Sequence, residues 1–133
     1  MIEQALKYIL VNDATVKAIT TRVYYDNIPQ DPTYPLILIT QISGHRDQVL
    51  RGPTGHAHPR YQVDAWTQKA SGYGHKYTAR RLADAIREAL NGYSGTVEGR
   101  TIKSCLLDNE RPKNEPELKA YRIMQDYMIW HEE

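Results

Sequence analysis

The chain has 133 residues, 25% of them charged, and a formal net charge of +1. This length fits one domain, over residues 1–133, with a sizeable core, and the balanced charge argues against a protein that binds nucleic acid through overall basicity. The single cysteine, Cys105, excludes an internal disulfide and a multi-thiolate zinc site, and we expect it to be a small buried hydrophobe.

The first third of the chain predicts a bent helical segment followed by two strands. Apolar residues on one helical face indicate a helix over 2–10, and Asp13 is placed to cap a short second helix over 14–19. Residues 22–25 form a short strand before three prolines enforce an extended connection. The run 36–42 predicts a central strand, because its first four residues are apolar on both faces.

The segment 44–59 is basic and rich in glycine and proline, and it runs directly into a strongly alternating strand over 60–66. It has no apolar period that a helix could use, so it predicts a long flexible loop. Connections of about fifteen residues without secondary structure are uncommon inside a domain and are usually functional or disordered. We therefore expect the function to lie in this segment, which would order when it contacts a partner.

The second half predicts one main helix and two further strands. The helix covers 73–90 and ends at residues 91–92, with Gly92 in the left-handed cap position. A strand over 102–107, a charged loop over 109–116 and a last strand over 118–130 follow. Together the elements predict an α/β (α+β) fold: a two-layer sandwich with a mostly antiparallel sheet of four or five strands and two main helices on one face.

Both faces of the last strand are partly apolar. Met124, Met128 and Trp130 share one face with Arg122 and Asp126. If the helices cover the opposite face, this one carries large apolar residues in a polar setting, which is typical of a subunit interface before its partner binds. The pattern predicts that the chain assembles with other subunits.

Short motifs follow one another along nearly the whole chain: ISG at 42–44, RD at 46–47, GP at 52–53, RYQVDAW at 60–66, LADAIREAL at 82–90, LDNER at 107–111, YRI at 121–123 and WHE at 130–132. In this order they resemble the tail completion family of tailed bacteriophages and prophages. The resemblance implies a structural subunit of the virion, assembled in the bacterial cytoplasm, that forms a homo-oligomeric ring, a hexamer, at the head-proximal end of the tail tube. There it would stop tube growth and provide the head–tail joining surface, with the tail tube protein and a head-completion or connector protein as partners.

Ten residues are candidates for protein contacts, because they place charged or large apolar side chains on the basic loop, the uncovered sheet face or the charged loop. They are Arg46, Asp47, Arg51, Arg60, Trp66, Glu110, Arg111, Met124, Met128 and Trp130.

Two interpretations of the charged residues stay open. The arginines of the basic loop either pair with Asp47 or a neighbouring subunit's acids, or make non-specific, salt-sensitive contacts with DNA in the channel. Glu110 and Arg111 either face water or contact an adjacent ring.

No constellation indicates catalysis, a metal or a cofactor. The serines lack a nucleophile elbow, no phosphate-binding loop or dinucleotide fingerprint follows a strand, and the loop histidines lack further ligands at metal-site spacing. No apolar run is long enough to span a membrane, and no signal-peptide core is present. We expect a structural protein that is not an enzyme. The alternatives are a nucleic-acid-binding module that uses the basic loop, and another ring component of the head–tail connector.

Overall fold

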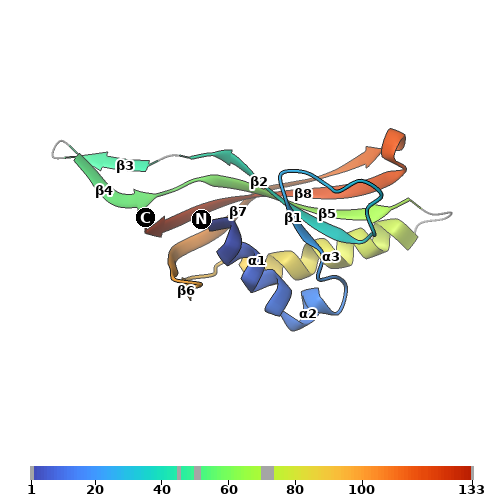
Figure 1. Ribbon diagram of the computed structural model, residues 1–133, viewed down its shortest axis with the longest axis horizontal. Coiled ribbons are helices and arrows are strands. Elements are labelled where there is room, and N and C mark those ends of the chain that lie inside the picture. The colour runs from blue at the N-terminus through green and yellow to red at the C-terminus, as the bar shows by residue number, and fades with distance from the viewer. Residues whose placement is uncertain (1, 45, 50–51, 70–73, 133) are drawn as a thin grey trace.

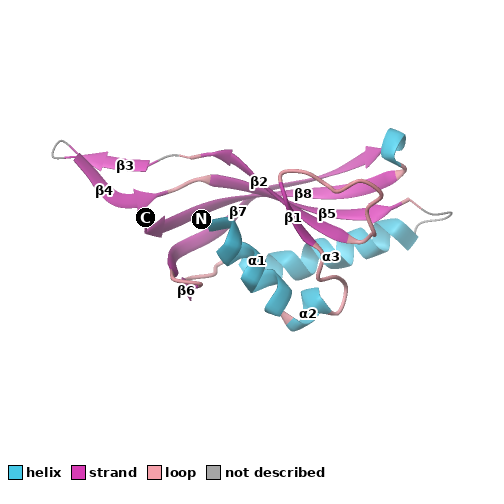
Figure 2. Cartoon of the chain, viewed as in Figure 1, coloured by secondary structure: helices cyan, strands magenta, loops and turns pink. Residues whose placement is uncertain are grey.

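The computed structural model describes residues 2–44, 46–49, 52–69 and 74–132. Within them, three α-helices lie on one side of a long, curled sheet (Figures 1 and 2). The helices are α1 (Ile2–Asn12), α2 (Ala14–Lys17) and α3 (Gly74–Leu90), with a short 3-10 helix, η1 (Pro116–Leu118). The strands are β1 (Val23–Tyr25), β2 (Leu36–Ser43), β3 (Arg46–Val49), β4 (Gly52–Ala57), β5 (Arg60–Gln68), β6 (Gly95–Val97), β7 (Arg100–Glu115) and β8 (Ala120–Glu132).

Strand β8 is the central strand of the sheet. It pairs antiparallel with β5 from Ala120 to Met128 on one edge and with β7 from Ala120 to His131 on the other. Strand β4 continues the edge of β5 by pairing with the last residues of β8. Beyond β5 lie β2 and then β1, which is parallel to β2, and β6 pairs with the start of β7.

Strands β2 to β5 form one long hairpin that is interrupted in the middle of both arms. One interruption lies between Ser43 and Arg46, and the other at His58 and the buried Pro59. The outer half, β3–β4, extends beyond the rest of the molecule (Figure 1) and joins the sheet at the end of β8. We call this outer half the distal hairpin.

The expected loop over 44–59 is therefore wrong for residues 46–49 and 52–57, which form β3 and β4, whereas residues 44, 58 and 59 lie outside the strands. Two strands can pair through backbone hydrogen bonds even when apolar and polar side chains do not alternate along them. This segment lacks that alternation, so its sequence does not indicate strands. The described residues of this segment form no helix.

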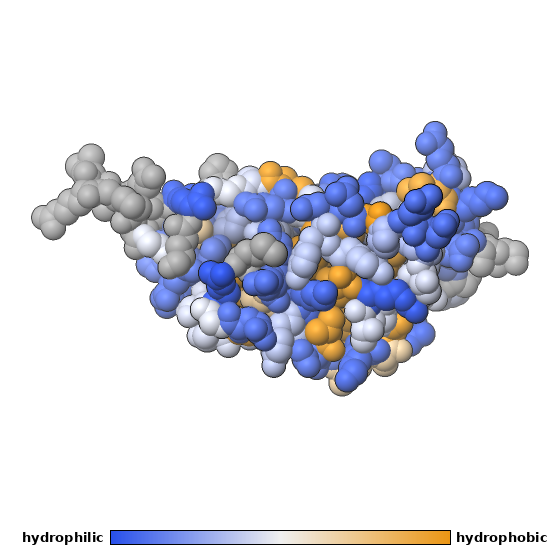
Figure 3. Space-filling model, in the orientation of Figure 1, coloured by the Kyte–Doolittle hydropathy of each residue, from blue (hydrophilic) through white to orange (hydrophobic). Residues whose placement is uncertain are grey.

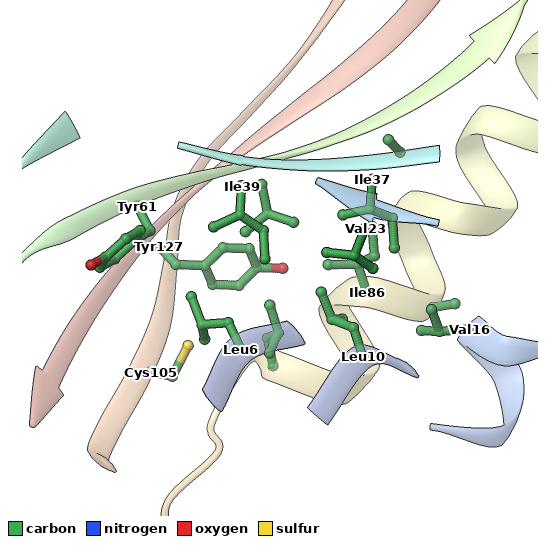
Figure 4. Close-up of a cluster of buried hydrophobic side chains, with 14 of the residues drawn as sticks. Leu6, Leu10, Val16, Val23, Ile37, Ile39, Tyr61, Ile86, Cys105 and Tyr127 are labelled. Carbon is green, nitrogen blue, oxygen red and sulfur yellow. The ribbon is translucent and has the colours of Figure 1, made fainter. Parts of the chain in front are cut away.

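The main core lies between the helices and the sheet. Alternate residues of each strand face the helices, as the two-residue period of a strand requires. Figure 4 shows helix and sheet side chains meeting in this core, including Leu6, Leu10 and Ile86 from the helices and Ile37, Ile39, Tyr61 and Tyr127 from the sheet. Cys105 is 1% exposed in the same cluster, which confirms its expected place in the core, and burial raises the pKa of its thiol to about 12.

A second, smaller cluster lies on the opposite face of the sheet. Leu36, Leu38, Trp66 and Ala120 are buried there beneath partly buried side chains from the β1–β2 connection and its flanks, Tyr24, Ile28 and Tyr34. The first four residues of β2 are buried on both faces for this reason. That connection covers one end of the face, and no described α-helix lies on the rest (Figure 2).

The local helix signals are confirmed. The carboxylate of Asp13 accepts hydrogen bonds from the backbone N–H groups of Thr15 and Val16, which caps α2. Helix α3 ends where expected, with Gly92 at φ 83°.

The strand number and the charged loop are corrected. The fold is mixed α+β, but its sheet has eight described strands, so the two-layer sandwich with four or five strands is inaccurate. Residues 109–115 form the outer part of β7 and pair with residues 120–126 of β8. Register shifts between Ile102 and Ser104 and between Leu107 and Asn109 mark bulges, which interrupt the alternation that would otherwise identify a strand.

Two polar side chains, Gln125 and Tyr127, are hydrogen-bonded to each other inside the core. The Tyr127 hydroxyl donates to Gln125 Oε1 at 2.8 Å, and Gln125 Nε2 donates to the carbonyl oxygen of Ala83 in α3 at 2.9 Å. Tyr127 and Gln125 are 0% and 1% exposed. The chain of hydrogen bonds ties β8 to α3.

We expect Tyr127→Phe to lower the free energy of unfolding by about 1–3 kcal/mol, because Gln125 Oε1 loses its donor inside the core. Urea denaturation monitored by circular dichroism measures this change. The control is Tyr8→Phe, since Tyr8 is 47% exposed, and its effect should stay within about 0.5 kcal/mol. Equal effects of the two substitutions would contradict this role of the hydroxyl.

Candidate protein interface on the open sheet face

The sheet face opposite the helices is formed by the even-numbered residues of β5 and β8 together with their neighbours on β2 and β7. We call it the open face. The odd-numbered residues Tyr61, Val63, Ile123 and Tyr127 belong to the core beneath the helices. Since side chains alternate along a strand, the even-numbered residues point to the other side.

Among the described residues, four arginine–carboxylate ion pairs connect strands across the open face. Three of them have hydrogen-bond geometry: Arg60–Asp108 at 2.6 Å, Arg111–Asp126 at 3.0 Å and Arg122–Asp64 at 3.1 Å. Asp64 and Asp126 are only 1% and 8% exposed. Buried carboxylates are stable only when they are paired and hydrogen-bonded, so these contacts hold β5, β8 and β7 in one register.

Arg122 lies at the centre of the network. Its guanidinium stacks over the Trp66 ring, with Cζ 4.9 Å from the ring centroid. Its Nε lies 3.1 Å from Glu115 Oε1, although this ion pair lacks hydrogen-bond geometry. Among the described residues, the buried side-chain polar atoms without a hydrogen-bond partner are Asp64 Oδ1, Trp66 Nε1, Arg122 Nε and Asp126 Oδ1, all on this face.

Burial has the largest effect on the pKa of the Asp64 carboxyl. It raises the pKa of this carboxyl from 3.8 to about 6, although Arg122 and a hydrogen bond from Gln62 act in the opposite direction. At neutral pH the folded chain therefore holds an ionised carboxylate in an environment that disfavours the charge.

The exposed apolar residues of the open face lie beside this network. Leu106, which pairs with Met128, is 52% exposed, and Trp130 is 37% exposed. Ile42, which is 51% exposed, is the extra residue of a bulge in β2 next to Ser43, the partner of Arg60. The half-buried Met128 pairs with Arg60 on one side and Leu106 on the other, so apolar and charged side chains share one row across the sheet. We call Ile42, Leu106, Met128 and Trp130 the apolar row. In the orientation of Figure 1, hydrophilic residues cover most of the visible surface, and small apolar patches lie between them (Figure 3).

The Trp130 end of the row carries an aromatic stack. The His58 ring lies over the Trp130 ring, with centroids 4.3 Å apart and planes inclined by 21°. His58 belongs to the interruption between β4 and β5, so the stack connects the start of the distal hairpin to β8.

The structure brings six of the ten candidates together on the open face: Arg60, Trp66, Arg111, Met124, Met128 and Trp130. Trp66 and Met124 are 4% and 6% exposed, so within the single chain they contact their own neighbours. Glu110 lies on the other face, where it forms an ion pair with Arg80 of α3. Arg46 is exposed on β3, Asp47 belongs to the same strand, and Arg51 lies outside the described residues.

The expected pairing of Arg60 with Asp47 or a neighbouring subunit's acid is not what the chain shows, since Arg60 pairs with its own Asp108. Asp108, Ile42 and Leu106 were not among the candidates. Asp108 lies at a bulge of β7, so simple alternation does not place it on the open face.

Within residues 2–44, 46–49, 52–69 and 74–132, no group of three histidine, cysteine, aspartate or glutamate side chains is placed to hold a metal ion. No helix in the same described ranges has the length and apolar character needed to cross a membrane.

Exposed apolar side chains between ion pairs on one sheet face are typical of a surface that contacts another protein. The family model for "Tail completion protein gp17" matches residues 4–132, and the chain belongs to this family. It is therefore a structural component of a bacteriophage tail and is located in the virion.

Solved structures show the same fold. A chain in the "Virion of native gene transfer agent (GTA) particle" has a TM-score of 0.70 at 17% identity, over 98% of this chain and 94% of that one. A second solved structure, without a functional description, has a TM-score of 0.59 at 11% identity, over 98% and 95%. A search of curated proteins finds no significant match.

We expect Asp64→Asn to change the pH dependence of stability. Because the folded-state pKa of about 6 lies above the ordinary 3.8, the contribution of Asp64 is fully present below about pH 4 and is lost as the pH rises through about 6. The stability of the wild type relative to Asp64→Asn should therefore fall by roughly 2 kcal/mol between pH 4 and pH 7. Urea titrations at both pH values measure it, and a difference independent of pH would contradict the effect of burial.

Proposed function

We propose that this subunit closes into a ring on the end of the phage tail tube, stops tube polymerisation and provides the surface to which the head joins. The ring is six-fold. The observation that carries the proposal is the apolar row, where Ile42, Leu106 and Trp130 remain exposed on a sheet face without a helix layer.

Single exposed apolar residues are normal on protein surfaces, whereas a group within one polar setting indicates an interaction site. The apolar row adjoins the exposed Arg60–Asp108 ion pair, and arginine is enriched at interfaces together with aromatic residues and methionine. A contact between two different surfaces of identical copies, repeated around an axis, closes a ring. The mechanism is complementary shape and symmetry, without a chemical reaction.

The distal hairpin supports contacts beyond the ring. A two-stranded hairpin is marginally stable by itself, and the described backbone pairing of this one with β8 is short, since it consists of His56 with Glu132 and Ala57 with His131. Its outer strand edges are suited to a neighbouring virion protein, because unpaired backbone groups are a template for further strands. We assign this segment to contact with the tail tube protein or the head-completion protein.

A nucleic-acid-binding role has less support. Arg60 and Arg111, together with Arg122, form ion pairs with carboxylates of the same chain, and these partners reduce the positive charge that a phosphate would meet. Contacts with DNA in the channel would then be weak and easily screened by salt.

We expect Leu106→Asp to retain the fold but to weaken ring formation tenfold or more, since a carboxylate would enter an apolar contact. Native mass spectrometry and negative-stain microscopy measure ring content, and the wild type should give discrete rings rather than long cylinders. Tyr8→Asp is the matched control, because Tyr8 is 47% exposed on α1 and Leu106 is 52% exposed. A wild type that forms no rings would overturn the proposal. Equal effects of both variants on ring content would show that the apolar row is not the ring contact.

We expect a shortened distal hairpin to leave the fold intact but to abolish head–tail joining. Replacing residues 48–53 by Asn-Gly removes the pairs Gln48–Pro53 and Val49–Gly52 and keeps the buried Ala57 against β8. A complementation assay measures virion yield, with thermal unfolding as the check on folding. Normal virion yield from this variant would exclude the distal hairpin as a joining element.

A further inference from the structure

A groove lies between the start of α3 and the outer parts of β7 and β8. Its volume is about 610 Å³, and its mostly apolar lining includes Tyr77, Pro112, Tyr121 and Ile123. Tyr77 is 72% exposed at its border. A groove of this size suits a short peptide segment better than a single side chain.

The helix side of the groove is basic. Lys76 and Arg80, from the first two turns of α3, line the groove, and the first acid of the helix is Asp84. Arg80 forms an ion pair with Glu110 across the groove. The Lys76 ammonium lies 5.9 Å from the centroid of the Tyr121 ring, above the apolar lining. This border favours a segment that carries a carboxylate next to an apolar side chain.

The same chain presents such a segment in η1. Leu118 is 58% exposed there, and Glu117 is exposed and forms no ion pair with any residue that the structure describes. The turn is held in place at both ends. Glu115 forms an ion pair with Arg122, and the backbone N–H of Lys69 donates to the carbonyl oxygen of Lys119 at 2.8 Å.

The turn and the groove belong to opposite sides of the sheet. In Figure 2 η1 lies on the side away from the helices, whereas α3, which borders the groove, lies beneath the sheet. The turn of one chain is therefore directed away from the groove of the same chain. A second copy can bring its turn to this groove.

We infer that the η1 turn of one copy binds in the α3 groove of the next copy, with Leu118 on the apolar lining and Glu117 paired with Lys76. This inference rests on the proposed ring and names one of its subunit contacts. The two surfaces differ, so the contact is head-to-tail and repeats from copy to copy, as a closed ring requires. The complementarity is both apolar and electrostatic.

Disulfide cross-linking tests the contact. Leu118→Cys protein is mixed with Tyr77→Cys protein under mild oxidation, and covalent dimers are counted on non-reducing gels. A disulfide needs Cα atoms within about 7 Å, so dimers of the two variants report direct contact. Native Cys105 is buried and does not compete for disulfide formation.

The control pairs Leu118→Cys with Glu88→Cys, an exposed position further along α3. We expect a yield several-fold above the control, and a yield equal to the control overturns the inference.

A charge exchange supplies the second measurement. Glu117→Lys, added to the Leu118→Cys protein, should lower the yield several-fold, and Lys76→Glu, added to the Tyr77→Cys protein, should do the same. Combining both should restore it, because the ion pair is re-formed with reversed charges. All the replaced residues are exposed, so the fold is retained. Failure of the combination to restore the yield overturns the pairing.

Discrete wild-type rings with cross-linking at the control level reject this contact and leave the proposed function standing, whereas absence of rings rejects the proposed function itself.

Discussion

Strand β8 is the element on which the rest of the structure depends, because it is paired along both edges and its two faces have different chemistry. Its odd-numbered residues enter the core beneath α1 and α3, and its even-numbered residues form the middle of the open face. A shift of its register by one residue would bring Arg122 and Asp126 into the apolar core. The cost of burying these charges among apolar side chains fixes the pairing of β5, β8 and β7.

The ion pairs of the open face are costly to bury. Asp64 and Asp126 each keep one buried oxygen without a hydrogen-bond partner, and the raised pKa of Asp64 reflects the same desolvation. A well-packed apolar pair is often at least as stable as a buried ion pair. We therefore regard the network as a device for specificity: it holds the strands that present the apolar row at defined positions, at some expense of stability.

The parts of the fold that follow local rules were predictable from the sequence. The apolar period of α3, its end at Gly92 and the cap at Asp13 depend on neighbouring residues only. Alternation along β8 placed Met128 and Trp130 on the face opposite the core, and the structure agrees.

The remaining features depend on contacts between distant residues. Strand β7 extends through a polar segment because β8 pairs with it, and its bulges remove the alternation that predicts strands. The distal hairpin is likewise held by backbone pairing between strands whose sequences do not alternate between apolar and polar residues. Trp66 is covered by the β1–β2 connection, so its burial could not be inferred from its own strand. Asp108 meets Arg60 only after β7, β8 and β5 are assembled.

The two-sided character of β8 also separates two selective pressures within one strand. Substitutions at its odd-numbered positions must preserve packing against α1 and α3 of the same polypeptide, so compensating changes will arise within this gene. In the proposed ring, its exposed even-numbered positions contact the surface of an identical copy, so a compensating change can arise at a distant position of the same gene. Adjacent codons of a single strand are then constrained by different contacts, one within the subunit and one between subunits.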